Sequence, residues 1–240
     1  MLLEIISANF FVSLIAFIGI FYLLLKAKTM EKILKPLISF AAGVLIAGAF
    51  FCLIPEILTF EFGFQFVVFG LVSFFVLERF LFWRHCHKGK CEIHEFAYLN
   101  LVGDFIHNFL DGVIIAASFL INFNFGIITT FLVAIHEIPQ EIGDFAVLIY
   151  GGIKRKKALL LNFLVALASV LGGIFGYFFM IGKEFIIKSL IAIAAGGFIY
   201  ISLSDLIPEI RKERKIRREF FNLIAFLIGI LILYFLVLRI

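Results

Sequence analysis

The chain has 240 residues, of which 63% are hydrophobic and only 16% are charged. Soluble domains are usually about 45–50% apolar, so this composition argues against one. The formal net charge is +4, but the basic residues lie in short segments between long apolar runs. That distribution indicates membrane topology and excludes nucleic acid as the partner.

Eight apolar runs follow one another along the chain, each near the length of about 20 residues that spans a bilayer. They lie at roughly 5–25, 37–55, 63–83, 97–120, 125–150, 157–181, 185–207 and 219–239. The first run is too long for a signal peptide and has no basic segment before it, so we expect it to remain as a helix. The sequence therefore predicts an all-α, polytopic membrane protein that forms one transmembrane domain over residues 1–240.

The basic residues predict which way the chain crosses the membrane. Of the 21 Lys and Arg residues, 18 follow the first, third, fifth and seventh runs, at 26–35, 79–90, 154–157 and 211–218. Segments rich in Lys and Arg stay in the cytoplasm. We therefore expect a multi-pass protein of the cell membrane with both termini on the extracytoplasmic side.

Two segments of the chain resemble each other at an offset of 153 residues. Residues 41–57 read AAGVLIAGAFFCLIPEI and residues 194–210 read AAGGFIYISLSDLIPEI, with Ala-Ala-Gly and Leu-Ile-Pro-Glu-Ile in common. The predicted topology makes these two spans run in opposite directions. An inverted repeat of spans 1–3 and 6–8 around a central pair, spans 4 and 5, is typical of transporters. Alternatively, the shared small residues only allow close helix packing.

The central pair carries the polar residues that a membrane helix tolerates least. Ionisable groups at bilayer depth cost about 2.5–3.5 kcal/mol each on insertion scales, so they are expected to face the protein interior. Span 4 has four polar residues on one helical face and span 5 has five on neighbouring rows: Asp104, His107, Asn108 and Asp111, then His136, Glu137, Gln140, Glu141 and Asp144.

This donor set predicts a site for one or two divalent cations near the middle of the bilayer. Imidazole, carboxylate and amide oxygen suit Zn²⁺, and also Fe²⁺ or Mn²⁺. Asp104 and Asp144 lie towards the cytoplasm and predict an exit path, or else they pair with basic side chains. A metal-free polar network that holds the helices together and a proton relay are the alternatives for the cluster as a whole.

The motifs in the central pair resemble those of the ZIP (Zrt/Irt-like) metal-transporter family. Residues 107–112 read HNFLDG and 136–148 read HEIPQEIGDFAVL, and the resemblance extends to 41–56 and 194–209. It implies an eight-helix fold and a non-enzymatic function, the movement of Zn²⁺, Fe²⁺, Mn²⁺ or Cd²⁺ into the cytosol. It also implies a binuclear site, with six residues at matching motif positions: His107, Asn108, Asp111, His136, Glu137 and Glu141.

Two positions depart from the family pattern. Gln140 stands where the related branch has His, and its amide oxygen is a weaker, uncharged ligand. Cys52 stands where relatives often place a histidine near the outer mouth, so it is either an entrance ligand or a small buried hydrophobe. The residue equivalent to Cys52 in the second repeat is Asp205, near the cytoplasmic end of span 7.

A cytoplasmic loop at 84–96, between spans 3 and 4, combines histidine with cysteine. Its spacing fits no standard zinc finger, so we expect either a low-affinity metal site or a solvated loop. The residues concerned are His85, Cys86, His87, Cys91 and His94.

Other functions and partners remain open at this point. The segment HEIPQ is one residue short of the HExxH zinc motif, because Gln140 replaces the second histidine. An intramembrane zinc-dependent hydrolase or protease is therefore one alternative, and a passive metal channel is another. Gly172 and Gly176 form a small-xxx-small face that supports either a homodimer or close packing within the chain. The expected partners are divalent metal ions and the lipid bilayer.

Overall fold

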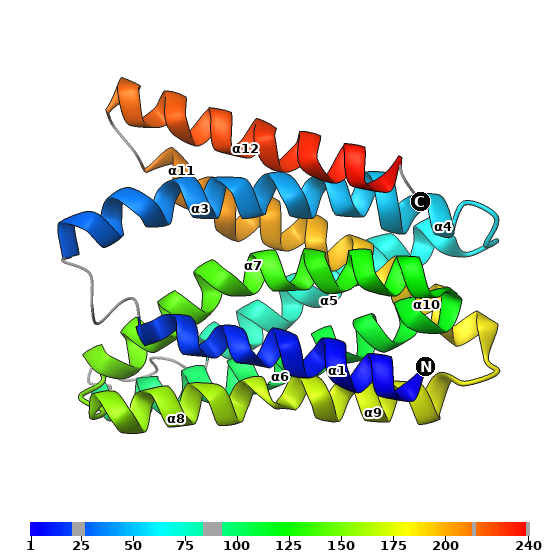
Figure 1. The fold of residues 1–240 in the computed structure, drawn as a ribbon, viewed down its shortest axis with the longest axis horizontal. Helices are drawn as coiled ribbons and strands as arrows, with labels where there is room; N and C mark the ends of the chain where they lie inside the picture. Colours follow the sequence, from blue (N-terminus) through cyan, green and yellow to red (C-terminus); the bar gives the residue numbers. More distant parts are fainter. Residues whose placement is uncertain (21–26, 84–92, 213–214, 239–240) are drawn as a thin grey trace.

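The computed structural model describes residues 1–20, 27–83, 93–212 and 215–238, and every element in these ranges is a helix. Long helices run side by side along one axis and form a bundle (Figure 1). They are α1 (Leu2–Ser13) with the 3-10 turn η1 (Leu14–Ile18), α3 (Ala27–Gly48), α5 (Gly63–Trp83), α6 (Ile93–Ile121), α7 (Phe123–Tyr150), α8 (Arg155–Ala166), α9 (Ala168–Met180), α10 (Glu184–Tyr200) and α12 (Ile216–Val237).

Helical structure is present at each of the eight predicted positions, but some boundaries differ. The second helix begins at Ala27, ten residues before the predicted span, because Ala, Lys and Glu in this stretch are strong helix formers. The predicted loop 84–96 is also too long. Helix α6 already begins at Ile93.

Five segments are long and apolar enough to cross a membrane: Lys32–Glu56, Asn100–Ile121, Arg155–Met180, Glu184–Arg211 and Ile216–Val237. Helices α5 and α7, of 21 and 28 residues, stand outside this group of five. Residues 2–18 form a shorter apolar helix. Large apolar side chains cover much of the outer surface, including Leu231 and Phe235 on α12, as expected of a surface that faces lipid. The chain is a multi-pass membrane protein.

Two pairs of helices cross at equivalent residues. A Cβ atom on Gly43 of α3 would lie 2.1 Å from the carbonyl oxygen of Phe226 in α12. A Cβ atom on Gly196 of α10 would lie 2.0 Å from the carbonyl oxygen of Val67 in α5. Gly43 and Gly196 are related by the offset of 153, and α3 and α10 run in opposite directions (Figure 1). Close crossings of this kind require glycine because any side chain would push the backbones apart.

The two repeated segments also share a local backbone irregularity. Helix α3 continues into the π-helix η2 (Ala49–Leu53) and the short α4 (Ile54–Glu56). Helix α10 continues into the π-helix η3 (Ile201–Leu206) and the short α11 (Ile207–Arg211). Each π-helix thus stands directly before an Ile-Pro-Glu sequence. The irregularity belongs to the repeated sequence and is not peculiar to either copy.

The glycine face of α9 packs within the chain. A Cβ atom on Gly172 would lie 2.0 Å from the carbonyl oxygen of Phe109 in α6, and one on Gly176 would lie 3.0 Å from the Cβ atom of Ala116. The backbones of α6 and α9 therefore approach closely along this face. This surface is already used inside the protein, so it does not provide the homodimer contact that the sequence suggested.

Candidate metal site

The site rests on the hairpin of α6 and α7, which a single residue connects. Asn122 caps α7, and its side-chain oxygen accepts a hydrogen bond of 2.8 Å from the backbone N–H of Phe125. His107 lies fifteen residues before Asn122 and His136 lies fourteen residues after it. At about 1.5 Å of rise per residue, the two antiparallel helices bring both imidazoles to the same depth.

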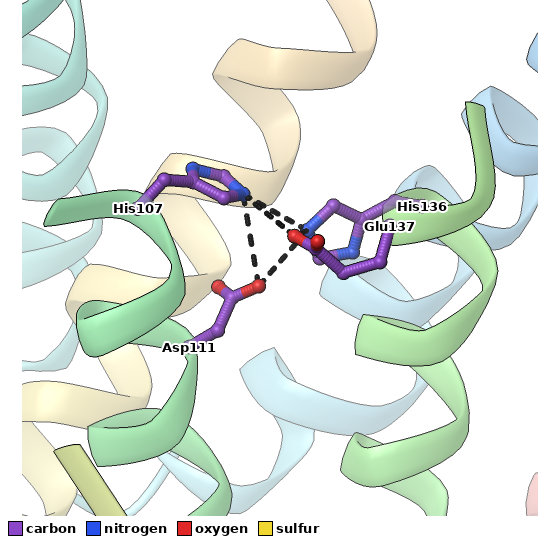
Figure 2. Close-up of side chains that lie close together, drawn as sticks. All are labelled: His107, Asp111, His136 and Glu137. Atoms are coloured by element: carbon purple, nitrogen blue, oxygen red, sulfur yellow. Dashed lines mark hydrogen bonds and ion pairs between the residues drawn. The ribbon is translucent and has the colours of Figure 1, made fainter. Parts of the chain in front are cut away.

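Four side chains from this hairpin meet in one cluster, His107 and Asp111 from α6 with His136 and Glu137 from α7 (Figure 2). One ligand atom of each lies within 4.8 Å of the others. The His107 Nε2 atom is 3.3 Å from Glu137 Oε1 and 3.6 Å from Asp111 Oδ2. The His136 Nε2 atom is 3.2 Å from Asp111 Oδ2 and 3.6 Å from Glu137 Oε1. We call these four residues the quartet.

The backbone of α7 orients the imidazole of His136. Its Nδ1 atom lies 3.2 Å from the carbonyl oxygen of Leu132, and because a carbonyl only accepts, Nδ1 carries the hydrogen in that contact. The Nε2 lone pair is then left to face the quartet. Metal-binding histidines are typically held in this way, with one ring nitrogen fixed by a hydrogen bond and the other on the metal.

The carboxylates of the quartet have oxygen atoms with no hydrogen-bond partner. Asp111 Oδ2 and both oxygens of Glu137 are buried and have no hydrogen-bond partner. Asp111 is 3% exposed and Glu137 is 1% exposed. Unpartnered buried charge is costly. Two carboxylates and two imidazoles converge here, and their donor atoms and formal charge suit one dication such as Zn²⁺.

Three further carboxylates of the hairpin, two buried and one half-buried, are each held by an asparagine. Asn108 Nδ2 donates to Asp104 Oδ1 at 2.7 Å, so this motif asparagine turns towards its own helix. Asn100 Nδ2 donates to Asp144 Oδ1 at 2.8 Å. Glu141 Oε2 accepts a hydrogen bond from Asn162 of α8. Glu141 is not one of the four clustered ligands. Gln140 lies one turn after His136 and is half-buried.

The remaining predicted residues lie in different surroundings. Cys52 is buried in η2 as a free thiol, and Asp205 is exposed in η3. His94 lies in the first turn of α6. The other residues of the predicted loop site lie outside the described residues, namely His85, Cys86, His87 and Cys91. Whether these residues and Gln140 or Asn108 bind metal stays a prediction.

Sequence reasoning missed the asparagines that hold Asp144 and Glu141. Asn100 and Asn162 were not singled out because an amide carries no charge and stands apart from the two motifs. The available signal was their position inside apolar runs, where an amide requires a partner much as an ionisable group does. The hydrogen bond that Tyr200 of α10 donates to Glu78 of α5 was also missed.

The fold and the site together define a polytopic helical membrane protein with a buried cluster suited to a divalent cation. The family model for the ZIP zinc transporter matches residues 84–237. The match covers more than half of the chain and both ligand helices, so the chain belongs to the ZIP family.

Curated relatives agree with this assignment. The chain is 32% identical to the zinc transporter ZIP13 of Pongo abelii over 222 residues, which is 83% of this chain and 66% of that protein. It is 39% identical to zinc transporter zipt-7.2 of Caenorhabditis elegans over 142 residues, 58% of this chain and 31% of the relative. It is 38% identical to the metal cation symporter ZIP8 of Rattus norvegicus over 126 residues, 52% and 27%. The chain thus spans less than two thirds of each relative's length. The relatives carry the names of transporters, not of enzymes.

Proposed function

We propose that this protein transports divalent transition-metal cations, Zn²⁺ foremost, across the cell membrane into the cytosol. The observation that carries the proposal is the quartet, two imidazoles and two carboxylates that converge inside a membrane protein, where Asp111 Oδ2 and both Glu137 oxygens have no hydrogen-bond partner. Fe²⁺, Mn²⁺ and Cd²⁺ are further substrates that this donor set accommodates. Two ions bind if Asn108, Gln140 and Glu141 act as ligands beside the quartet.

The proposed architecture has eight transmembrane helices, with spans 1–3 and 6–8 as an inverted repeat around α6 and α7. The equivalent glycine crossings at Gly43 and Gly196 and the two π-helices support it. Such halves can move against a central site and expose it to each side in turn. This arrangement favours a carrier over a passive channel.

The proposed orientation places both termini outside the cytoplasm. In Figure 1 the two termini lie at one end of the bundle, and the connection between α7 and α8 lies with α11 at the other. The basic residues at the start of α8 and in α11 therefore lie at the end opposite the termini, and the positive-inside rule favours a cytoplasmic location for that end. The ion would enter near Cys52 and leave past Asp104, Asp144 and Asp205, and residues 84–96 would contribute a cytoplasmic metal site. Any homodimer must use a surface other than the Gly172 face.

Hydrolase activity is not favoured. A zinc hydrolase of the HExxH type needs two histidines one turn apart on one helix. In α7 the residue one turn after His136 is Gln140. The second imidazole of the quartet comes from α6, and Glu137 Oε1 lies 3.3 Å from its Nε2 atom.

The test is uptake of ⁶⁵Zn²⁺ into proteoliposomes by the wild type and by His107→Ala and His136→Ala. We expect saturable uptake by the wild type and its loss in both variants, because each removes one of four ligands. Thr130→Ala is the matched control. It lies in α7, is buried, and its hydroxyl donates to the carbonyl of Gly126 in its own helix. Wild-type protein that binds Zn²⁺ tightly without uptake would contradict transport and point to a sensor or hydrolase.

A further inference from the structure

Glu141 belongs to the ligand motif of α7, yet its carboxylate is held by a residue of another helix, Asn162 of α8. We infer that Asn162 is a positioning residue for transport. It fixes the Glu141 carboxylate next to the quartet as an oxygen ligand for the passing cation. Its loss should therefore affect oxygen-preferring cations most. The inference rests on the proposed transport function.

The contact between the two residues is fully buried. Asn162 is 0% exposed and Glu141 is 1% exposed. The Asn162 Nδ2 atom donates to Glu141 Oε2 and lies 3.5 Å from the Glu141 backbone oxygen. A buried carboxylate without a donor is unfavourable, so this amide decides where the Glu141 side chain rests.

An amide partner leaves the charge of the carboxylate available. A lysine or arginine at position 162 would neutralise Glu141 and compete with an incoming cation. Asn162 donates a hydrogen bond without adding a positive charge, and the carboxyl groups of Asp104, Glu137 and Asp144 act electrostatically on Glu141. The local field therefore stays attractive for a dication beside the quartet.

Asn162 also presents an oxygen of its own. Its Oδ1 atom is buried and has no hydrogen-bond partner. Glu141 and Asn162 together offer only oxygen donors, whereas the quartet offers two imidazoles. Oxygen donors suit Mn²⁺ better than Zn²⁺, and imidazole suits Zn²⁺. Loss of Asn162 should therefore shift the ratio of Mn²⁺ to Zn²⁺ transport, which a general loss of stability would not do.

The chain contains a matched control for Asn162. Asn9 of α1 is its equivalent at the offset of 153 and is also 0% exposed. Its Nδ2 donates to the carbonyl of Ile5 at 2.8 Å and its Oδ1 accepts from Ser169 Oγ at 2.6 Å. Asn9→Ala therefore removes an equally buried and bonded amide whose partners are not metal-ligand candidates.

The experiment measures uptake of ⁶⁵Zn²⁺ and ⁵⁴Mn²⁺ into proteoliposomes, normalised to folded protein. It compares the wild type with Asn162→Ala, Glu141→Ala, the double variant, Asn9→Ala, and Asn9→Ala combined with Glu141→Ala. We expect Asn162→Ala to lower maximal Mn²⁺ uptake about tenfold, the effect of losing a hydrogen bond to a charged group, and Zn²⁺ uptake less. Asn162→Ala should have no further effect once Glu141 is alanine. Asn9→Ala should change the uptake of both metals by the same factor, and its effect should add to that of Glu141→Ala.

The outcomes separate the inference from the proposed function. Equal loss of both metals in Asn162→Ala, or an additive double variant, would show that Asn162 acts only structurally. Unchanged uptake by Asn162→Ala, with saturable uptake by the wild type, would overturn the inference and leave the function standing. No uptake of either metal by the wild type would overturn both. If Asn162→Ala does not fold, Asn162→Ser replaces it in the comparison with Glu141→Ala and the double variant. The shorter serine side chain cannot make the same contact with Glu141.

Discussion

Gly43 and Gly196 allow a direct test of the inverted repeat, because each lies where two helices touch through their backbones. A Cβ atom would come within 2.1 Å of the Phe226 oxygen at Gly43 and within 2.0 Å of the Val67 oxygen at Gly196. Carbon–oxygen contacts normally begin at about 3.3 Å. Alanine at either position must therefore move two helices apart by more than about 1 Å, and neither obstacle is a side chain that can rotate away.

The expected cost of Gly43→Ala and of Gly196→Ala is about 1–3 kcal/mol each, typical of overpacking in a close-packed interior. For a chain of this size that lowers Tm by roughly 2–12 °C. The assay heats purified protein in detergent and measures the fraction that remains monodisperse at each temperature. Gly143→Ala is the control, since a Cβ atom there has nothing within 4 Å. It should be neutral or stabilising by about 0.5–1 kcal/mol, because alanine is the better helix former.

Two results would refute this reasoning. If Gly43→Ala and Gly196→Ala were tolerated as well as Gly143→Ala, the helix crossings would be looser than the structure shows. If one of them were several times more destabilising than the other, the two crossings would not be equivalent. The inverted repeat would then lose its structural support. A similar loss of stability in both variants agrees with two copies of one packing arrangement.

Three further predictions concern the metal site. Asp111→Asn and Glu137→Gln each remove one of two negative charges from the quartet and should weaken Zn²⁺ binding about 1,000-fold, measured by competition with a chromogenic chelator. Unit charges 4 Å apart interact by about 4 kcal/mol at an effective dielectric of 20, so an unchanged affinity would exclude these ligands. Lowering the pH from 7 to 5 should weaken Zn²⁺ binding in the same assay, because histidine and carboxylate ligands must lose their protons to bind; a flat profile contradicts the donor set. Gln140→His adds an imidazole one turn from His136 and should raise Zn²⁺ affinity about tenfold while slowing uptake. Equal affinity would show that position 140 does not face the ion.

The parts of the structure that follow from local pattern could be predicted from the sequence. Apolar runs locate helices because backbone groups in lipid must bond within their own segment. The spacing of His107 and Asp111, one helical turn apart, places both on one face of α6, and the adjacent His136 and Glu137 supply the partners from α7. A one-residue connection at Asn122 then sets the register between the helices. The quartet is therefore visible in the sequence once the hairpin is assumed.

The parts that depend on packing between distant helices could not be predicted. Asn162 reaches Glu141 only because α8 lies against α7, and no local pattern specifies that neighbour. The same holds for the glycine face of α9, where the sequence allowed contact with a second chain or with its own. Close approach to the Phe109 oxygen of α6 decides between them. Glycine spacing shows that a helix face is flat but not which helix covers it.

The π-helices connect the repeated sequence with the asymmetry that transport needs. Pro55 and Pro208 lack the N–H that would bond to the carbonyls of Phe51 and Ser204, and both carbonyls lie inside the π segments. Both copies therefore build the same widened turn. The side chains that occupy equivalent places in it differ, because Cys52 is buried while Asp205 is exposed. Under the proposed transport function, one backbone design used twice, with a thiol in one copy and a carboxylate in the other, would provide two openings of different chemistry on opposite sides of a central site.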